Sequence, residues 1–168
     1  AATRGDFRVQ PDTAAMTTIG QIMKSTDGGA TWRAVFGTTD DPSETFADAV
    51  QQIVADPSDF NTLYASVRDA YILKSTDKGE TWTIVFDARE TIIGRMEMSI
   101  SPVDNQTIYF GAETNSGAVL YRTQDGGGTW NEIPGDFGNW YGGQGWYDNI
   151  IKADPVDLNK VYVGGVSY

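Results

Sequence analysis

The sequence predicts an all-β protein assembled from a repeated unit of four antiparallel strands. Two recurring motifs support this prediction. An octapeptide with the pattern (S/T)-x-D-x-G-x-T-W occurs at residues 25–32, 75–82 and 123–130. A Pro turn followed by a Tyr-bearing strand occurs out of step with it, at residues 55–65, 101–110 and 153–163. Four strands repeating about every 50 residues are typical of β-propeller blades, so a β-propeller is the expected architecture.

The octapeptide is expected to be the turn of a β-hairpin, because Asp-Gly sequences between two apolar runs favour tight turns. The flanking strands are expected at 21–24 and 33–36, at 71–74 and 83–86, and at 119–122 and 131–133. In the Pro turn, Pro fixes φ and a short polar side chain bonds its own backbone. Apolar strands at 53–54, 98–100 and 150–151 precede this turn. Each unit therefore has strands A to D in chain order, with the Pro turn between A and B.

We expect a single propeller segment over residues 1–168. Its parts are strands C and D of a first blade (21–36), a second blade (48–86), a third blade (95–134), and strands A and B of a fourth (147–168). The total is about three blades, whereas propellers close with about four to eight. We therefore expect a segment of a larger propeller, completed by remaining blades of the same protein or by a second chain.

The composition excludes several classes of chemistry. The 168 residues include no Cys and no His, so disulfides, thiolate zinc sites, Cys nucleophiles and a Ser-His-Asp triad are ruled out. The net charge of −11 makes nucleic acid an unfavourable partner, because phosphate binding needs a basic face. No apolar run approaches the length of a membrane span, so membrane insertion is not expected. We expect neither a cofactor nor a metal ion.

The octapeptide resembles the Asp-box, or BNR, repeat of sialidases, sortilin-type receptors and two-propeller xyloglucan hydrolases. The runs 145–149 and 161–165 are similar to secreted bacterial BNR proteins that are often labelled glycosyl hydrolase-like. The resemblance implies a β-propeller that is secreted, extracellular or at the cell surface. It implies no single activity, because the family contains enzymes, receptors and assembly factors.

The repeated Asp-box residues are expected to be structural. The Asp accepts backbone N–H groups within its turn, the Gly adopts positive φ, the Thr starts a strand, and the Trp packs between layers. These residues are Asp27, Gly29, Thr31 and Trp32; Asp77, Gly79, Thr81 and Trp82; and Asp125, Gly127, Thr129 and Trp130.

Strand parity predicts where a ligand would bind. The A–B and C–D turns share one face of an antiparallel blade, so the loops of variable sequence lie on the opposite face, where sites are commonly built. Those loops are 37–48, 68–70, 87–94, 113–117 and 135–147. The candidate ligand-binding residues are Trp140, Tyr141, Gln144, Trp146 and Tyr147, with Arg68, Arg95 and Asp148 nearby. The aromatic residues are expected either to stack on sugars or to pack over blade edges or a neighbouring chain.

Two functions follow from these features. The first is a non-catalytic extracellular segment that recognises a glycan or a protein, or that serves structural assembly. The alternative is part of a glycoside hydrolase active site, sialidase-like or endoglucanase-like, which would need two carboxylates with one raised pKa. A sialidase would also need three converging arginines, and the sequence around Arg68, Arg89 and Arg95 matches no such motif. The catalytic residues, if the chain contributes any, are unknown.

Overall fold

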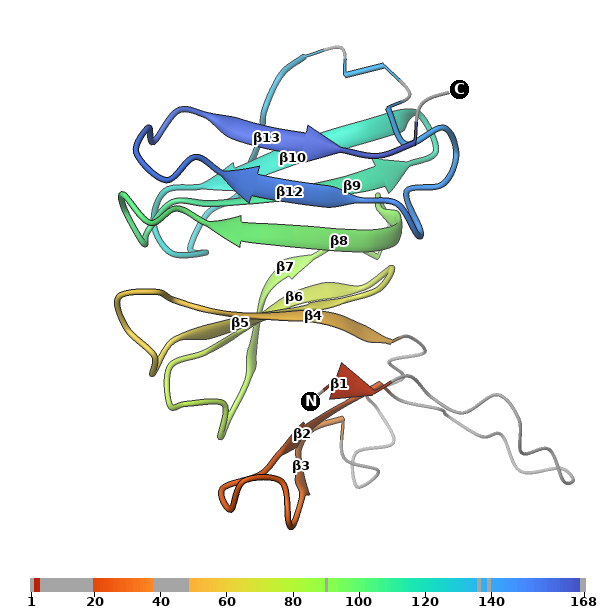
Figure 1. Cartoon of the computed structure of the whole chain (residues 1–168). Coiled ribbons are helices and arrows are strands. Elements are labelled where there is room, and N and C mark those ends of the chain that lie inside the picture. Colours follow the sequence, from red (N-terminus) through yellow and green to blue (C-terminus); the bar gives the residue numbers. More distant parts are fainter. Residues whose placement is uncertain are drawn as a thin grey trace, which may run out of the picture.

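The computed structural model describes residues 2–3, 20–37, 49–89, 91–135, 137–138 and 140–166. Every regular element in these ranges is a β-strand, and the strands form four sheets (Figure 1). Most of the 37–48 loop named above lies outside the described residues. No helix within these ranges has the length and apolar character needed to span a bilayer.

Two of the sheets have four antiparallel strands that neighbour one another in chain order. One contains β4 (Val50–Ala55), β5 (Leu63–Val67), β6 (Tyr71–Ser75) and β7 (Thr83–Asp87). The other contains β8 (Ile93–Ile100), β9 (Ile108–Thr114), β10 (Gly117–Thr123) and β11 (Asn131–Glu132). The predicted all-β class with four-stranded antiparallel sheets is confirmed.

The remaining strands form two smaller sheets. β12 (Ile150–Ala153) pairs with β13 (Val161–Gly164). β2 (Gln21–Lys24) pairs with β3 (Arg33–Phe36) on one side and with β1 (Ala2–Thr3) on the other. In Figure 1 the β1–β3 sheet lies at the bottom and the β4–β7 sheet above it, and the β8–β11 and β12–β13 sheets overlap at the top.

The Pro turns form because a short polar side chain replaces the missing backbone partners. Asp56 Oδ1 accepts the N–H groups of Ser58 and Asp59, at 2.8 and 3.1 Å. Asp154 Oδ1 accepts those of Val156 and Asp157, both at 2.9 Å. In the middle copy Ser101 Oγ accepts the N–H of Val103 at 3.2 Å. These side-chain bonds close the A–B turns, as the sequence predicts.

The hydrophobic core lies between the sheets and is divided into three clusters. The first, around Ile22, Val67 and Leu73, joins the β1–β3 and β4–β7 sheets. The second includes Tyr64, Ile72 and Phe110 and joins the two four-stranded sheets. The third contains Tyr109, Leu120, Ile151 and Ala153 and joins β8–β11 to β12–β13.

The turns and loops lie at opposite ends of this stack. The Pro turns from β4 to β5, β8 to β9 and β12 to β13 lie on the left of Figure 1, whereas the β9–β10 turn lies on the right. Strand parity predicts this separation. The right-hand end also carries the chain between β11 and β12, which contains the cluster of aromatic residues.

Candidate functional site

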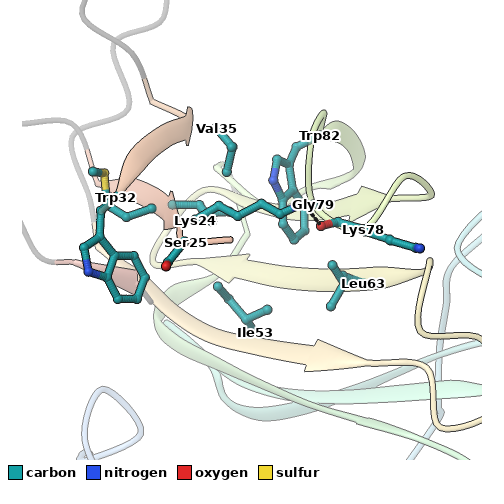
Figure 2. Close-up of a pocket in the computed structure, with 11 residues that line it drawn as sticks. Lys24, Ser25, Trp32, Val35, Ile53, Leu63, Lys78, Gly79 and Trp82 are labelled. Atoms are coloured by element: carbon teal, nitrogen blue, oxygen red, sulfur yellow. Dashed lines mark hydrogen bonds between the residues drawn. The ribbon is translucent and has the colours of Figure 1, made fainter. Parts of the chain in front are cut away.

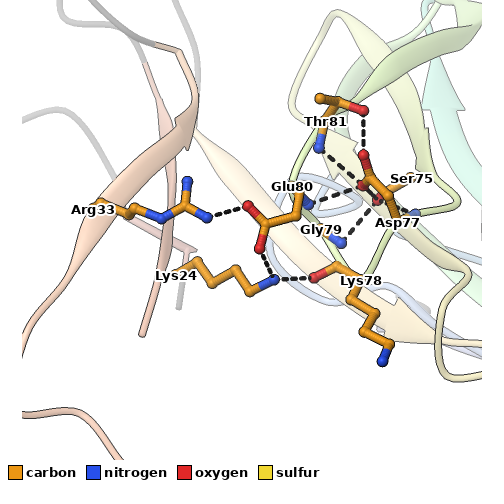
Figure 3. Close-up of polar contacts among 8 residues, drawn as sticks. All are labelled: Lys24, Arg33, Ser75, Asp77, Lys78, Gly79, Glu80 and Thr81. Carbon is orange, nitrogen blue, oxygen red and sulfur yellow. Dashed lines mark hydrogen bonds and ion pairs between the residues drawn. The ribbon is translucent and has the colours of Figure 1, made fainter. Parts of the chain in front are cut away.

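Each Asp-box is a turn closed by its own side chains. In the second box, Asp77 accepts the Thr81 N–H at 2.9 Å and the Thr81 hydroxyl at 2.6 Å. Ser75 Oγ donates to Asp77 at 2.8 Å and accepts the Gly79 N–H at 2.8 Å (Figure 3). The equivalent contacts recur in the boxes at 25–31 and 123–129. The three glycines have φ of 95°, 77° and 95°, a region that favours Gly.

These hydrogen bonds stabilise the charged form of each Asp. The Thr31 hydroxyl is the largest cause that lowers the pKa of Asp27 to about 2. The Thr129 N–H is the largest cause that lowers the pKa of Asp125 to about 2. The pKa of Asp77 is lowered in the same way, chiefly by the Thr81 hydroxyl. The carboxylates are therefore saturated with donors inside their own turns.

We predict that acid destabilises the protein between about pH 4 and pH 2. A carboxyl whose pKa is depressed in the folded state stabilises the fold above its ordinary pKa of 3.8, and this contribution is lost as pH falls through the folded value near 2. Urea unfolding at several pH values should show this loss. Asp125→Asn should shrink the pH dependence, and an unchanged dependence would contradict the role of the box.

Two of the four candidate aromatic residues pack inward. Tyr141 is fully buried, and its hydroxyl donates to Asn149 Oδ1 at 2.8 Å. Asn149 Nδ2 donates in turn to the Arg95 and Gly111 carbonyls, at 3.0 and 2.8 Å. Burial raises the pKa of Tyr141, so its hydroxyl stays protonated. Trp140 stands edge-on to Tyr141, with ring centroids 5.2 Å apart, and packs against the third cluster.

Trp146 and Tyr147, in contrast, are exposed side by side. Their side chains are 53% and 64% exposed, and their ring centroids are 5.6 Å apart. The Trp146 backbone lies so close to Gly94 that a Cβ on Gly94 would come within 3.0 Å of the Trp146 Cα. The Gln144 carbonyl accepts the N–H groups of Tyr147 and Asp148, both at 2.8 Å. The main chain of the loop is thus held in a turn, with two aromatic rings facing outward.

A hollow of about 390 Å³ adjoins these rings and is lined by Arg95, Tyr147 and Asp148, among others. Arg95 forms an ion pair with Glu97. Arg68 pairs with Asp69 at 3.2 Å, and the Asp69 carboxylate accepts the Gly94 N–H. Of the candidates, Arg95, Tyr147 and Asp148 share the hollow, Trp146 borders Tyr147, and Arg68 connects to the same region through Asp69.

Comparisons with known proteins identify the family of the chain. Residues 20–149 match the Sortilin-Vps10 family, described as "Sortilin, neurotensin receptor 3". The chain belongs to the Sortilin-Vps10 family. No curated protein matches the sequence.

Solved structures similar to this Sortilin-Vps10 chain include propeller enzymes. The GH74 enzyme of Niastella koreensis is 25% identical and has a TM-score of 0.61, over 88% of this chain and 22% of that one. An ancestral GH74 enzyme is 15% identical, with a TM-score of 0.49, over 66% and 15%. A structure titled "YCF48 bound to D1 peptide" is 22% identical, with a TM-score of 0.45, over 67% and 33%. The chain therefore spans less than a quarter of the length of these two GH74 enzymes.

A second hollow of this Sortilin-Vps10 chain, about 580 Å³, is lined by the first strands of three sheets, including Gln52, Glu97 and Lys152. Burial is the largest influence on Glu97 and raises its pKa, while Arg95 opposes the rise. Gln52 occupies the equivalent place one sheet earlier, five residues before Pro57 as Glu97 is before Pro102. Among the described residues, no three acidic side chains cluster as a metal site would require.

Sequence reasoning missed Glu97 and Asn149. Glu97 carries a signal, because an acidic residue stands within an apolar strand that precedes a Pro turn. Asn149 carries none, because two of its three partners, the Arg95 and Gly111 carbonyls, come from distant parts of the sequence.

Proposed function

We propose that this chain is a recognition segment of a β-propeller, and that it binds a neutral glycan at Trp146 and Tyr147. The observation that carries the proposal is the pair of exposed aromatic rings beside a hollow lined by Arg95 and Asp148. Exposed aromatic residues on the loops of a rigid scaffold commonly mark binding sites. We further propose an extracellular or lumenal location, which is consistent with membership of the Sortilin-Vps10 family.

The chemistry of the pair suits a sugar ring. The C–H face of a pyranose is apolar and stacks on an aromatic ring, while its hydroxyl groups need donors and acceptors at the rim. Asp148 supplies an acceptor and Arg95 a donor in the adjoining hollow. The net charge of −11 opposes binding of an anionic polysaccharide, so a neutral glycan is favoured.

We predict that Trp146→Ala and Tyr147→Ala together lower glycan affinity about 100-fold, since each central aromatic contact contributes about tenfold. An array of neutral oligosaccharides would identify a ligand, and titration calorimetry would measure its affinity for each variant. Phe60→Ala is the matched control, because Phe60 is 73% exposed but lies in a Pro turn at the opposite end of the stack. Unchanged affinity in the folded double variant would refute the aromatic site.

A second candidate is part of a glycoside hydrolase site, which is favoured by one observation. Glu97 combines burial, a raised pKa and a position on a large hollow, as a general acid requires. The similarity to a GH74 enzyme supports the same candidate. Release of new reducing ends from the identified glycan by the natural protein, lost in Glu97→Gln, would select the hydrolase over simple recognition.

A further inference from the structure

The interface between the two four-stranded sheets is closed by one tyrosine. The Tyr64 hydroxyl donates to the Gly126 carbonyl at 2.9 Å, and Lys74 Nζ donates to the same carbonyl at 2.7 Å. Lys74 Nζ also lies 5.5 Å from the centroid of the Tyr64 ring. A Cβ added to Gly127 would meet the Tyr64 ring and Val85, each at 3.6 Å or less. The ring therefore fills the space between β7 and the third Asp-box.

The interface between the β1–β3 and β4–β7 sheets has the same arrangement, except that the tyrosine is not among its described residues. Lys24, which precedes the first Asp-box as Lys74 precedes the second, donates from Nζ to the Lys78 carbonyl at 2.7 Å. Lys78 follows the Asp of its box, as Gly126 does. The Glu80 carboxylate forms an ion pair with Lys24, with Nζ and Oε1 2.6 Å apart, and a second ion pair with Arg33 (Figure 3). The same acceptor carbonyl and the same ammonium group are thus present.

A pocket of about 300 Å³ lies where the tyrosine would be. Its wall includes Lys24, Val35, Lys78 and Gly79, which are the repeat equivalents of Lys74, Val85, Gly126 and Gly127. Ile53, Leu63 and Trp82 complete its apolar side (Figure 2). β1 pairs with Gln21 and Ile22 of β2. In the next sheet, Tyr64 stands opposite Lys74.

We propose that this pocket is a phenol-binding site whose occupant is a tyrosine side chain. The ring lies between Val35 and Leu63, and its hydroxyl donates to the Lys78 carbonyl. The Lys24 ammonium group stands over the ring face, where a cation is attracted by the ring quadrupole. This inference is independent of the glycan site, because the pocket lies beside the Asp-boxes rather than beside Trp146.

The test uses p-cresol, the side-chain analogue of tyrosine, with the 168-residue chain. We expect saturable binding, with NMR contacts between the ring protons and the methyl groups of Val35 and Leu63. Toluene has a similar shape without the hydroxyl, so p-cresol should bind about five- to tenfold more tightly, as expected for one hydrogen bond.

Two variants distinguish p-cresol binding in this pocket from adventitious binding elsewhere on the chain. Val35→Trp fills the pocket and should abolish p-cresol binding. Ile84→Trp adds the same ring to an exposed position of β7 and should leave binding unchanged. Equal affinity for toluene, NMR contacts outside the pocket, or no saturation would each overturn the proposal, and the contacts in the unaltered chain decide the matter even if Val35→Trp fails to fold.

Discussion

Replacing Tyr64 by Ala is expected to lower the free energy of unfolding by about 3–5 kcal/mol, the usual cost of deleting a large buried ring. Tyr64 is 1% exposed and belongs to the cluster that joins the two four-stranded sheets. Its removal leaves a cavity and deprives the Gly126 carbonyl of one donor. Burial raises the pKa of Tyr64 to about 12, so its hydroxyl remains a donor throughout the ordinary pH range.

Urea unfolding of three variants checks this expectation. Tyr64→Phe keeps the ring and should cost only about 1 kcal/mol, the value of one hydrogen bond. Tyr162→Ala is the control at the equivalent position of β13, where the side chain is 58% exposed, and it should cost far less than Tyr64→Ala. p-Cresol should restore part of the stability of Tyr64→Ala. A loss near that of Tyr162→Ala would show that Tyr64 does not close the interface.

Replacing Asn149 by Leu is expected to lower the free energy of unfolding by about 3–5 kcal/mol, because it leaves three buried or half-buried polar groups without this partner at about 1–3 kcal/mol each. Those groups are the Tyr141 hydroxyl and the carbonyls of Arg95 and Gly111. Leu has a similar volume, so the cost is one of lost hydrogen bonds rather than of a cavity. The aromatic loop should loosen at the same time, since Asn149 connects it to β8 and β9.

Hydrogen exchange measures both effects of the Asn149 change. The amides of Tyr147 and Asp148, which donate to the Gln144 carbonyl, should exchange faster in Asn149→Leu. Tyr141→Phe removes one of the three bonds and should have a smaller effect. Asn159→Leu, on the exposed β12–β13 turn, is the control for the substitution itself. Unchanged exchange and stability in Asn149→Leu would contradict the connecting role.

Much of the fold could be predicted because its turns are encoded locally. The Asp, Gly and Thr of each box bond within eight residues, and the Asp56 and Asp154 turns bond within three. Such contacts leave a signature in a short window of sequence. The β1 strand was missed because its two residues, Ala2 and Thr3, are too short a segment to show a pattern in the sequence.

The candidate site was harder to predict because its aromatic residues are distributed by distant contacts. Trp140 and Trp146 are each followed directly by a Tyr. What turns Tyr141 inward is the room left by glycines elsewhere, since a Cβ on Gly111 would lie 2.7 Å from its hydroxyl. Trp32 shows the same limit in the first box, because it is half exposed rather than packed between layers. Burial depends on neighbours that local motifs do not specify.

The division of the core into three separate clusters also governs how the molecule responds to damage. Among the described residues, each core cluster joins two neighbouring sheets, so the stability of the stack is close to a sum of terms for single sheets and their shared boundaries. A destabilising substitution at one boundary therefore mainly affects the two sheets that share it. Sequence change can accumulate sheet by sheet, and the loops at one end are free to diversify while the boundaries behind them stay intact.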